Sequence, residues 1–172
     1  HALGAAEADT RLARAALWPD LVISGAYMSE RAPRIDRIGH WNRLFAEKGI
    51  SPGSVVIIRS DFSVDSIALF ISTIKNDCVV VPVVGSDIPR EEMAAICQAD
   101  YHVQMDRDGQ FGFETVGSHG SKSGLLADFA KERKPGLVFF TSGSTGKPKG
   151  TLHNVENLFL KFKSSRKAYV TL

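Results

Sequence analysis

Cysteine is scarce in this sequence of 172 residues, which contains only Cys78 and Cys97. The two cysteines lie in apolar or amphipathic surroundings and do not form a C-x-x-C pair, so the sequence predicts neither a disulfide framework nor a metal site. The five histidines do not have the spacing of metal ligands either. We therefore interpret both thiols as reduced core residues of a cytoplasmic protein.

Long apolar runs and a strong charge imbalance are also lacking. No apolar segment is long enough to cross a bilayer, and no signal-peptide pattern is visible, so we expect no membrane span. The net charge is only +2, and no basic segment alternates with aromatic residues, which argues against a nucleic-acid partner. A hydrophobic content of 44% with 23% charged residues is typical of a globular domain.

Positive charge is concentrated in the last quarter of the chain. From residue 131 onward, two acidic residues stand against nine basic ones, which are Lys131, Arg133, Lys134, Lys147, Lys149, Lys161, Lys163, Arg166 and Lys167. Solvated helix surfaces explain this excess. It also fits an electrostatic field that favours a polyanionic nucleotide.

Apolar periodicity alternates between the helical and the extended pattern along the chain. The continuous β-branched run at 55–58 predicts a strand buried on both faces, and helical spacing follows over 64–74. Turn residues at 106–109 between two apolar stretches predict a hairpin of 101–105 with 111–116. The other expected helices are 5–17, 33–48, one from 89, 125–132 and 154–169, and the other strands are 21–23, 78–81 and one from 137. This order predicts an α/β fold with a mostly parallel sheet and helices on both faces.

The most informative segment follows the apolar run 137–140. It combines four hydroxyls, three glycines and two lysines in the order Thr141, Ser142, Gly143, Ser144, Thr145, Gly146, Lys147, Pro148, Lys149, Gly150. Glycines let backbone N–H groups approach an anion, hydroxyls add donors, and lysines neutralise charge. The segment is therefore predicted to bind polyphosphate at the carboxyl end of its strand, where ligands of such sheets sit.

A Walker-type P-loop is the obvious alternative, and the sequence departs from it twice. Thr141 stands where the motif requires its first glycine. Pro148 follows Lys147, where the motif requires a serine or threonine. Because the residue before a proline avoids the helical region, no helix is expected to begin at Lys147. The segment 149–153 is instead predicted to return as an extended strand, so that the loop closes a strand-loop-strand hairpin.

The string from Thr141 to Gly150 resembles the phosphate-binding signature T-S-G-[ST]-T-G-x-P-K-G of the AMP-forming adenylating superfamily at every position. This superfamily includes acyl-CoA synthetases, adenylation domains of nonribosomal peptide synthetases and luciferases of the firefly type. Weaker similarities lie at 49–56, 68–83 and 153–158, so the resemblance covers roughly residues 30–172. Asn76 and Ser54 depart from the usual family residues, and we interpret Asn76 as a left-handed helix cap in place of glycine.

The resemblance implies an ATP-dependent ligase, assisted by Mg²⁺, that activates a carboxylic acid as acyl-adenylate and transfers it to coenzyme A or a carrier-protein thiol. The implied nucleotide-binding residues are Thr141, Ser142, Gly143, Ser144, Thr145, Gly146, Lys147 and Lys149. Because the other working parts of the family are expected after Leu172, residues 1–172 are predicted to form a single domain or fragment: the N-terminal part of the large AMP-binding domain, inactive alone and without catalytic residues of its own.

Two further interpretations stay open. The acyl- or aryl-CoA synthetase type is favoured over a peptide-synthetase adenylation domain, because the strand after Cys78 lacks the fuller A-Y-V-P-L-D-P run of the latter. A non-catalytic nucleotide-binding module that kept the loop is the other alternative. His153, next to the loop strand, is a candidate for orienting a substrate or a residue that merely ends its strand.

Overall fold

The computed structural model describes residues 36–85, 88–106, 108–117, 122, 124–142 and 147–165. The helix predicted at 5–17 and the strand predicted at 21–23 lie outside these residues. The other predicted helices and strands are all present, with ends that differ by a few residues from the predicted ones.

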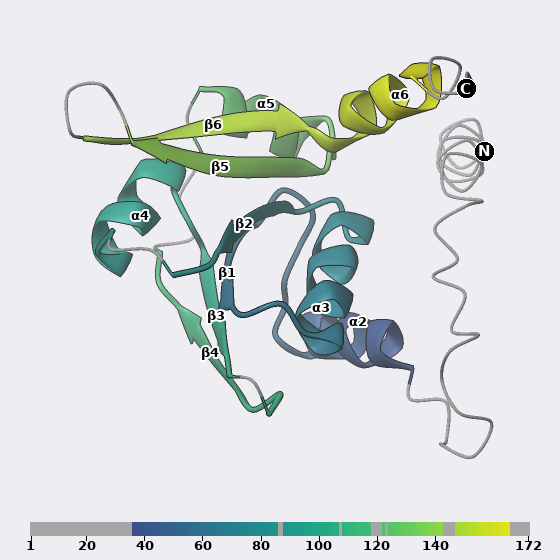
Figure 1. Ribbon diagram of the computed structural model, residues 1–172, viewed down its shortest axis with the longest axis vertical. Coiled ribbons are helices and arrows are strands. Elements are labelled where there is room, and N and C mark those ends of the chain that lie inside the picture. The colour runs from purple at the N-terminus through teal and green to yellow at the C-terminus, as the bar shows by residue number, and fades with distance from the viewer. Residues whose placement is uncertain are drawn as a thin grey trace, which may run out of the picture. The chain divides into compact units, whose positions relative to one another are not determined.

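A six-stranded sheet in the order β4-β3-β1-β2-β5-β6 organises the described part of the chain (Figure 1). The four central strands are parallel, and the two outer strands pair antiparallel with their neighbours. This confirms the mostly parallel sheet and the predicted hairpin, whose strands are β3 and β4. The strands are β1 (Val55–Ser60), β2 (Val79–Val83), β3 (Tyr101–Met105), β4 (Phe111–Thr115), β5 (Gly136–Ser142) and β6 (Pro148–Asn154).

Helices cover both faces of this sheet, as the alternating pattern predicts. They are α2 (Arg37–Glu47), α3 (Val64–Lys75), α4 (Arg90–Cys97), α5 (Leu125–Lys131) and α6 (Val155–Ser165). The helix α3 begins with a capping box, in which Ser63 and Ser66 each accept a hydrogen bond from the backbone N–H of the other. The helices α2 and α3 contact each other, and α4 lies on the other side of the sheet (Figure 1). Over the residues with assigned positions, no helix has the length and apolar character needed to cross a membrane.

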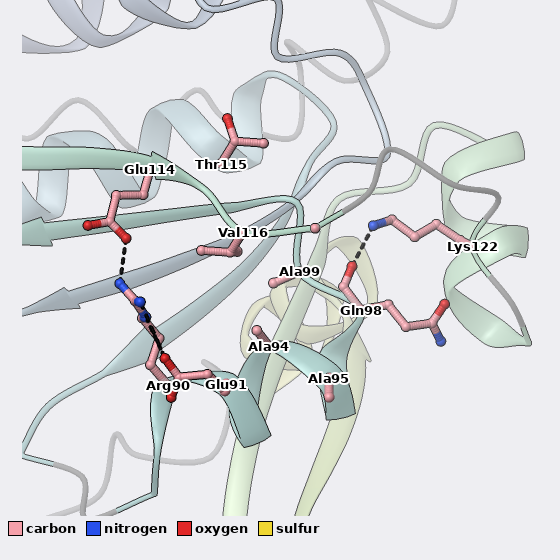
Figure 2. Close-up of a pocket in the computed structure, with 11 residues that line it drawn as sticks. Arg90, Glu91, Ala94, Ala95, Gln98, Ala99, Glu114, Thr115, Val116 and Lys122 are labelled. Carbon is pink, nitrogen blue, oxygen red and sulfur yellow. Dashed lines mark hydrogen bonds and ion pairs between the residues drawn. The ribbon is translucent and has the colours of Figure 1, made fainter.

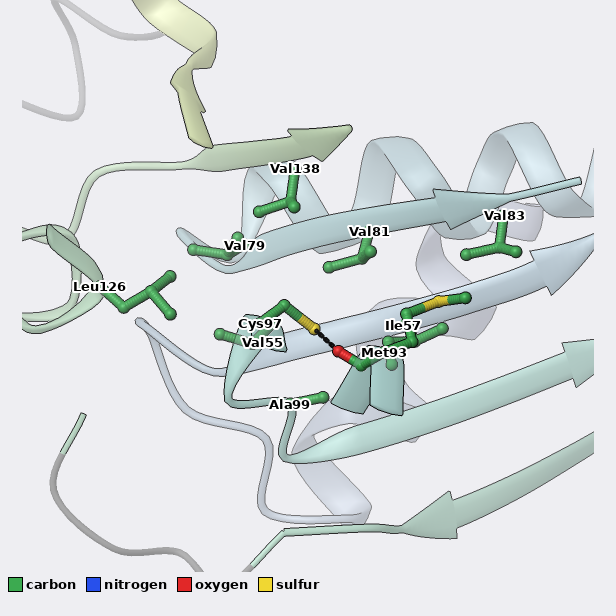
Figure 3. Packing of buried hydrophobic residues seen from close by; sticks show 10 residues of the cluster. All are labelled: Val55, Ile57, Val79, Val81, Val83, Met93, Cys97, Ala99, Leu126 and Val138. Atoms are coloured by element: carbon green, nitrogen blue, oxygen red, sulfur yellow. Dashed lines mark hydrogen bonds between the residues drawn. The ribbon is translucent and has the colours of Figure 1, made fainter. Parts of the chain in front are cut away.

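The core is built on the β1 run, whose first four residues are all buried. Val55 and Ile57 point to one face, where they join a cluster completed by α4 and by neighbouring strands (Figure 3). Val56 and Ile58 point to the opposite face. The run is therefore buried on both sides, which explains why it is continuous rather than alternating. The cluster consists of Val55, Ile57, Val79, Val81, Val83, Met93, Cys97, Ala99, Leu126 and Val138.

The cap predicted at the end of α3 is wrong in its position. Asn76 has φ −91°, which is not left-handed, and the left-handed residue is Asp77 with φ 56°. The side chain of Asn76 instead donates hydrogen bonds of 2.8 Å to Asn42 Oδ1 and to the carbonyl oxygen of Ser72. Asn76 therefore connects α3 to α2, and the left-handed residue after the helix is Asp77, one position later.

Candidate functional site

The predicted phosphate loop closes a long hairpin of β5 and β6. These strands pair from Gly136 with Asn154 to Ser142 with Pro148, so a strand follows the loop. The strand-loop-strand prediction is confirmed, and the P-loop alternative, which requires a helix at Lys147, is excluded. The ladder between β2 and β5 spans only Val79 with Gly136 and Val80 with Leu137. The distal half of the hairpin therefore extends beyond its pairing with β2.

One face of this hairpin packs on α4. Phe140 and Leu152 lie against the apolar cluster of which Val138 is part. A Cβ at Gly150 would lie 3.4 Å from Ile96 Cγ2 and 3.3 Å from Val138 Cγ1, so the helix approaches the strand closely there. Glycine at this position of the signature thus has a packing role as well as any role in the loop. This packing holds the base of the loop on a rigid support.

The opposite face of the hairpin is open. Thr141 and Lys149 form a cross-strand pair on this face, and both side chains are exposed. Side chains of directly paired residues in an antiparallel ladder lie about 4.5–5.5 Å apart at Cβ. A hydroxyl donor and an ammonium group are therefore held side by side at the carboxyl end of β5. A ligand that carries several acceptor oxygens fits this arrangement.

Two further predicted site residues, Lys147 and Ser142, lie next to this pair along the chain. Lys147 is exposed at the end of the loop, just before β6. Ser142 is the last residue of β5 and pairs with Pro148. The four central loop residues, Gly143, Ser144, Thr145 and Gly146, lie outside the described residues, so their contribution of N–H and hydroxyl donors stays a prediction.

The structure adds residues to this face that the sequence reasoning did not include. Phe139 is 46% exposed, and its ring lies 5.8 Å from that of His153 in an edge-on arrangement. Thr151, which pairs with Phe139, is also exposed. The signal that could have found them is the two-residue period of a strand, which places 149, 151 and 153 on one face. His153 is half-buried on this face and is the last residue but one of β6.

The helix after the hairpin begins as predicted. Asn154 Oδ1 accepts a hydrogen bond of 3.0 Å from the backbone N–H of Asn157, so Asn154 caps the start of α6. Val155 is buried, so α6 is anchored next to β6. Within the residues that the structure places, no group of three His, Cys, Asp or Glu side chains is arranged to hold a metal ion. Mg²⁺ accordingly stays an expectation from the resemblance.

Comparisons with known proteins agree with this geometry. No protein-family model matches the chain. The chain is similar to bacitracin synthase 1 of Bacillus licheniformis, with 29% identity over 130 residues that cover 64% of the chain and 2% of that protein.

Solved structures of adenylation enzymes share the fold. Apo MatB from Rhodopseudomonas palustris matches with a TM-score of 0.56 and 15% identity, over 77% of this chain and 31% of MatB. Its ATP-bound form matches with the same TM-score and 16% identity, over the same shares of the two chains. The complex of VinN with 3-methylaspartate matches with a TM-score of 0.57 and 16% identity, over 78% of this chain and 43% of VinN. The chain spans less than half the length of each of these relatives.

The match to bacitracin synthase 1 and the fold shared with these structures agree with the resemblance that the loop sequence predicts. The chain has the fold of the N-terminal subdomain of adenylate-forming enzymes.

Proposed function

We propose that the chain is the N-terminal part of an ATP-dependent, AMP-forming ligase. This enzyme activates a carboxylic acid as an acyl-adenylate and transfers the acyl group to a thiol. The observation that supports the proposal is the open face of the hairpin, where Thr141 and Lys149 lie side by side at the carboxyl end of β5. We also propose a cytoplasmic location. The two buried cysteines of the chain are free thiols, which fits a reducing compartment.

The chain's own residues have a defined task in this reaction. When a carboxylate attacks the α-phosphate of ATP, negative charge builds up on the departing pyrophosphate. The ammonium groups of Lys147 and Lys149 neutralise that charge, and the Thr141 hydroxyl donates a hydrogen bond to it. The hydroxyls of Ser142, Ser144 and Thr145 and the backbone N–H groups of Gly143 and Gly146 supply further donors.

Preorganisation makes this arrangement effective. Donors that are already in place when charge develops need no reorganisation during the reaction. The packing of Phe140 and Leu152 against the core fixes the two strands, while Thr141 and Lys149 on the open face stay accessible. Magnesium, if bound together with the nucleotide, would supply further positive charge against the phosphates and would need few protein ligands of its own.

The acceptor thiol distinguishes two versions of the proposal. Coenzyme A is the acceptor in an acyl- or aryl-CoA synthetase, the type that the sequence around β2 favours. The similarity to bacitracin synthase 1 favours the second version, in which the chain is part of a peptide-synthetase adenylation domain and the acceptor is a carrier-protein phosphopantetheine.

Acid-dependent exchange of labelled pyrophosphate into ATP by the complete protein tests the proposal. Fatty, aromatic and amino acids are screened, and one class is expected to support exchange. Coenzyme A and a phosphopantetheinylated carrier protein are then compared as acceptors for the activated acid. Nucleotide binding without exchange for any acid would reject the ligase and leave the non-catalytic nucleotide-binding module.

A further inference from the structure

A polar cluster lies beneath α4, on a sheet face that is otherwise apolar. His102 on β3 is 3% exposed, and Arg59 lies near the end of β1. His102 pairs with Ile57 of β1 on one side and with Glu114 of β4 on the other, so these side chains share a face. Ile57 packs against Met93 of α4, which identifies that face as the one covered by α4.

Among the described residues, two buried nitrogen atoms of this cluster have no hydrogen-bond partner. They are Arg59 Nε and His102 Nε2. Within the part of the chain that the structure describes, the guanidinium of Arg59 donates from Nη2 to the carbonyl oxygen of Ile88 at 3.5 Å, a long hydrogen bond. Leaving a buried polar group unpaired is unfavourable, because the group loses its hydrogen bonds to water and gains none in the protein. Two such groups in one cluster therefore point to an absent partner with acceptor atoms.

The amino end of α4 lies over the same cluster. The N-cap position is Pro89, which makes no side-chain cap bond. Arg90, the first residue of α4, binds the carboxylates of Glu91 and Glu114 (Figure 2). Arg90, Glu91 and Glu114 also line one end of a cavity of about 620 Å³.

The topology places Arg59, one member of this cluster, near the edge of the sheet where open α/β folds usually bind ligands. The chain runs from β1 to β2 on one side of β1, whereas β3 lies on the other side. The strand order thus reverses between β1 and β3, and ligands of such sheets lie outside the carboxyl ends of the strands at this reversal. Arg59 lies near the carboxyl end of β1, whereas His102, near the start of β3 and paired with Ile57, lies further inside the sheet. The cluster is separate from the hairpin of β5 and β6, so it goes beyond the proposed nucleotide site.

We propose that Arg59, Arg90 and His102 form a second site, for a small oxyanion such as a sulfate, phosphate or carboxylate group, and that the carboxylate of Glu114 occupies it when no anion is bound. The incoming anion displaces Glu114 from Arg90. It then accepts hydrogen bonds from Arg90, from Arg59 Nε and from the protonated His102 Nε2, and so provides the partners that the two buried nitrogens lack.

Binding at this site takes up a proton. His102 is faced by Arg59 from β1, by Glu114 from β4 and by Arg90 and Glu91 from α4. Burial, followed by the charges of Arg90 and Arg59, lowers the pKa of His102, so the imidazole is neutral near neutral pH. An anion beside the ring favours its charged form and raises this pKa. Anion affinity is therefore expected to increase as the pH falls.

Titration of the chain with sulfate, followed by NMR of the histidine rings, tests the proposal. Sulfate is chosen because its charge is constant between about pH 6 and about pH 7.5, where histidine titrates. Chloride keeps the ionic strength constant, and acetate in a parallel titration shows whether a carboxylate also binds. The ring signal of His102 is expected to shift on binding, with tighter binding at the lower pH. The H102Q variant identifies that signal and should lose the pH dependence.

Charge-neutralising variants sharpen the test. E114Q removes the internal competitor and should bind sulfate about tenfold more tightly, the effect of about 1.4 kcal/mol of relieved repulsion. E47Q removes the same charge from an exposed position on α2 and should bind as the wild type does. R90Q, at a partly exposed position, should bind at least about tenfold more weakly. An unshifted His102 signal in both wild type and E114Q, or equal tightening by E47Q and E114Q, would overturn the proposal.

Discussion

Replacing Lys149 with methionine isolates the charge that we assign to pyrophosphate. Lys149 is exposed on β6 and pairs with Thr141 across the open face of the hairpin. Methionine keeps an unbranched apolar chain but removes the ammonium. One charge-assisted hydrogen bond contributes about 1.5–3 kcal/mol. The rate of acid-dependent pyrophosphate exchange should therefore fall roughly tenfold to a hundredfold.

The same substitution should leave the fold intact. Exposed substitutions away from structural features usually change the free energy of unfolding by less than about 0.5 kcal/mol. Urea unfolding of the variant checks this, and Lys131→Met on α5 serves as the matched control, because Lys131 is also exposed but lies outside the hairpin. If K149M exchanged pyrophosphate as fast as K131M, the assignment of Lys149 to the phosphates would be refuted. A loss of exchange that merely tracked a loss of stability would refute it as well.

Three further predictions concern the core and its titrating groups. Met93→Ala should lower the free energy of unfolding by about 2–5 kcal/mol in urea titrations, because Met93 is 1% exposed within the cluster under α4, whereas a loss below about 0.5 kcal/mol would contradict that packing. Burial raises the pKa of Cys78 and of Cys97 to about 12, so a thiol reagent such as DTNB should modify both only after unfolding, and rapid labelling of the native protein would disprove their burial. Burial lowers the pKa of His102 from 6.5, so the unfolded state takes up its proton first, and the free energy of unfolding should decline as the pH falls below 6.5. H102Q should lessen this decline, and an unchanged pH profile would count against the assignment.

Elements that depend on local patterning could be predicted from the sequence. The run Val55–Ile58 is apolar at every position, which identifies a strand buried on both faces, and the structure shows that burial. Pro148 prevents a helix from starting at Lys147, and the chain does return as a strand. The wrong prediction of a left-handed cap at Asn76 also rested on local residue preferences, because asparagine and aspartate both tolerate the left-handed region. Asn76 donates a hydrogen bond to Asn42 of α2, which is 34 positions away in the sequence, and the left-handed residue is Asp77.

The candidate nucleotide site also has one part that the sequence determined and one part that the tertiary structure decided. The hydroxyls, glycines and lysines of the loop are consecutive in the chain, so the sequence alone determined the chemistry of this site. Which face of the hairpin stays open was decided only when Phe140 and Leu152 packed against the cluster, since that packing leaves Thr141 and Lys149 on the other side.

The cluster of Arg59, Arg90 and His102 has no sequence signature at all. Its members come from β1, α4 and β3, and only the strand register and the placement of α4 bring them together. Periodicity and turn chemistry act over a few residues, so they are readable in the sequence. Register and helix docking depend on how distant apolar surfaces are buried together, and this contribution belongs to the tertiary structure.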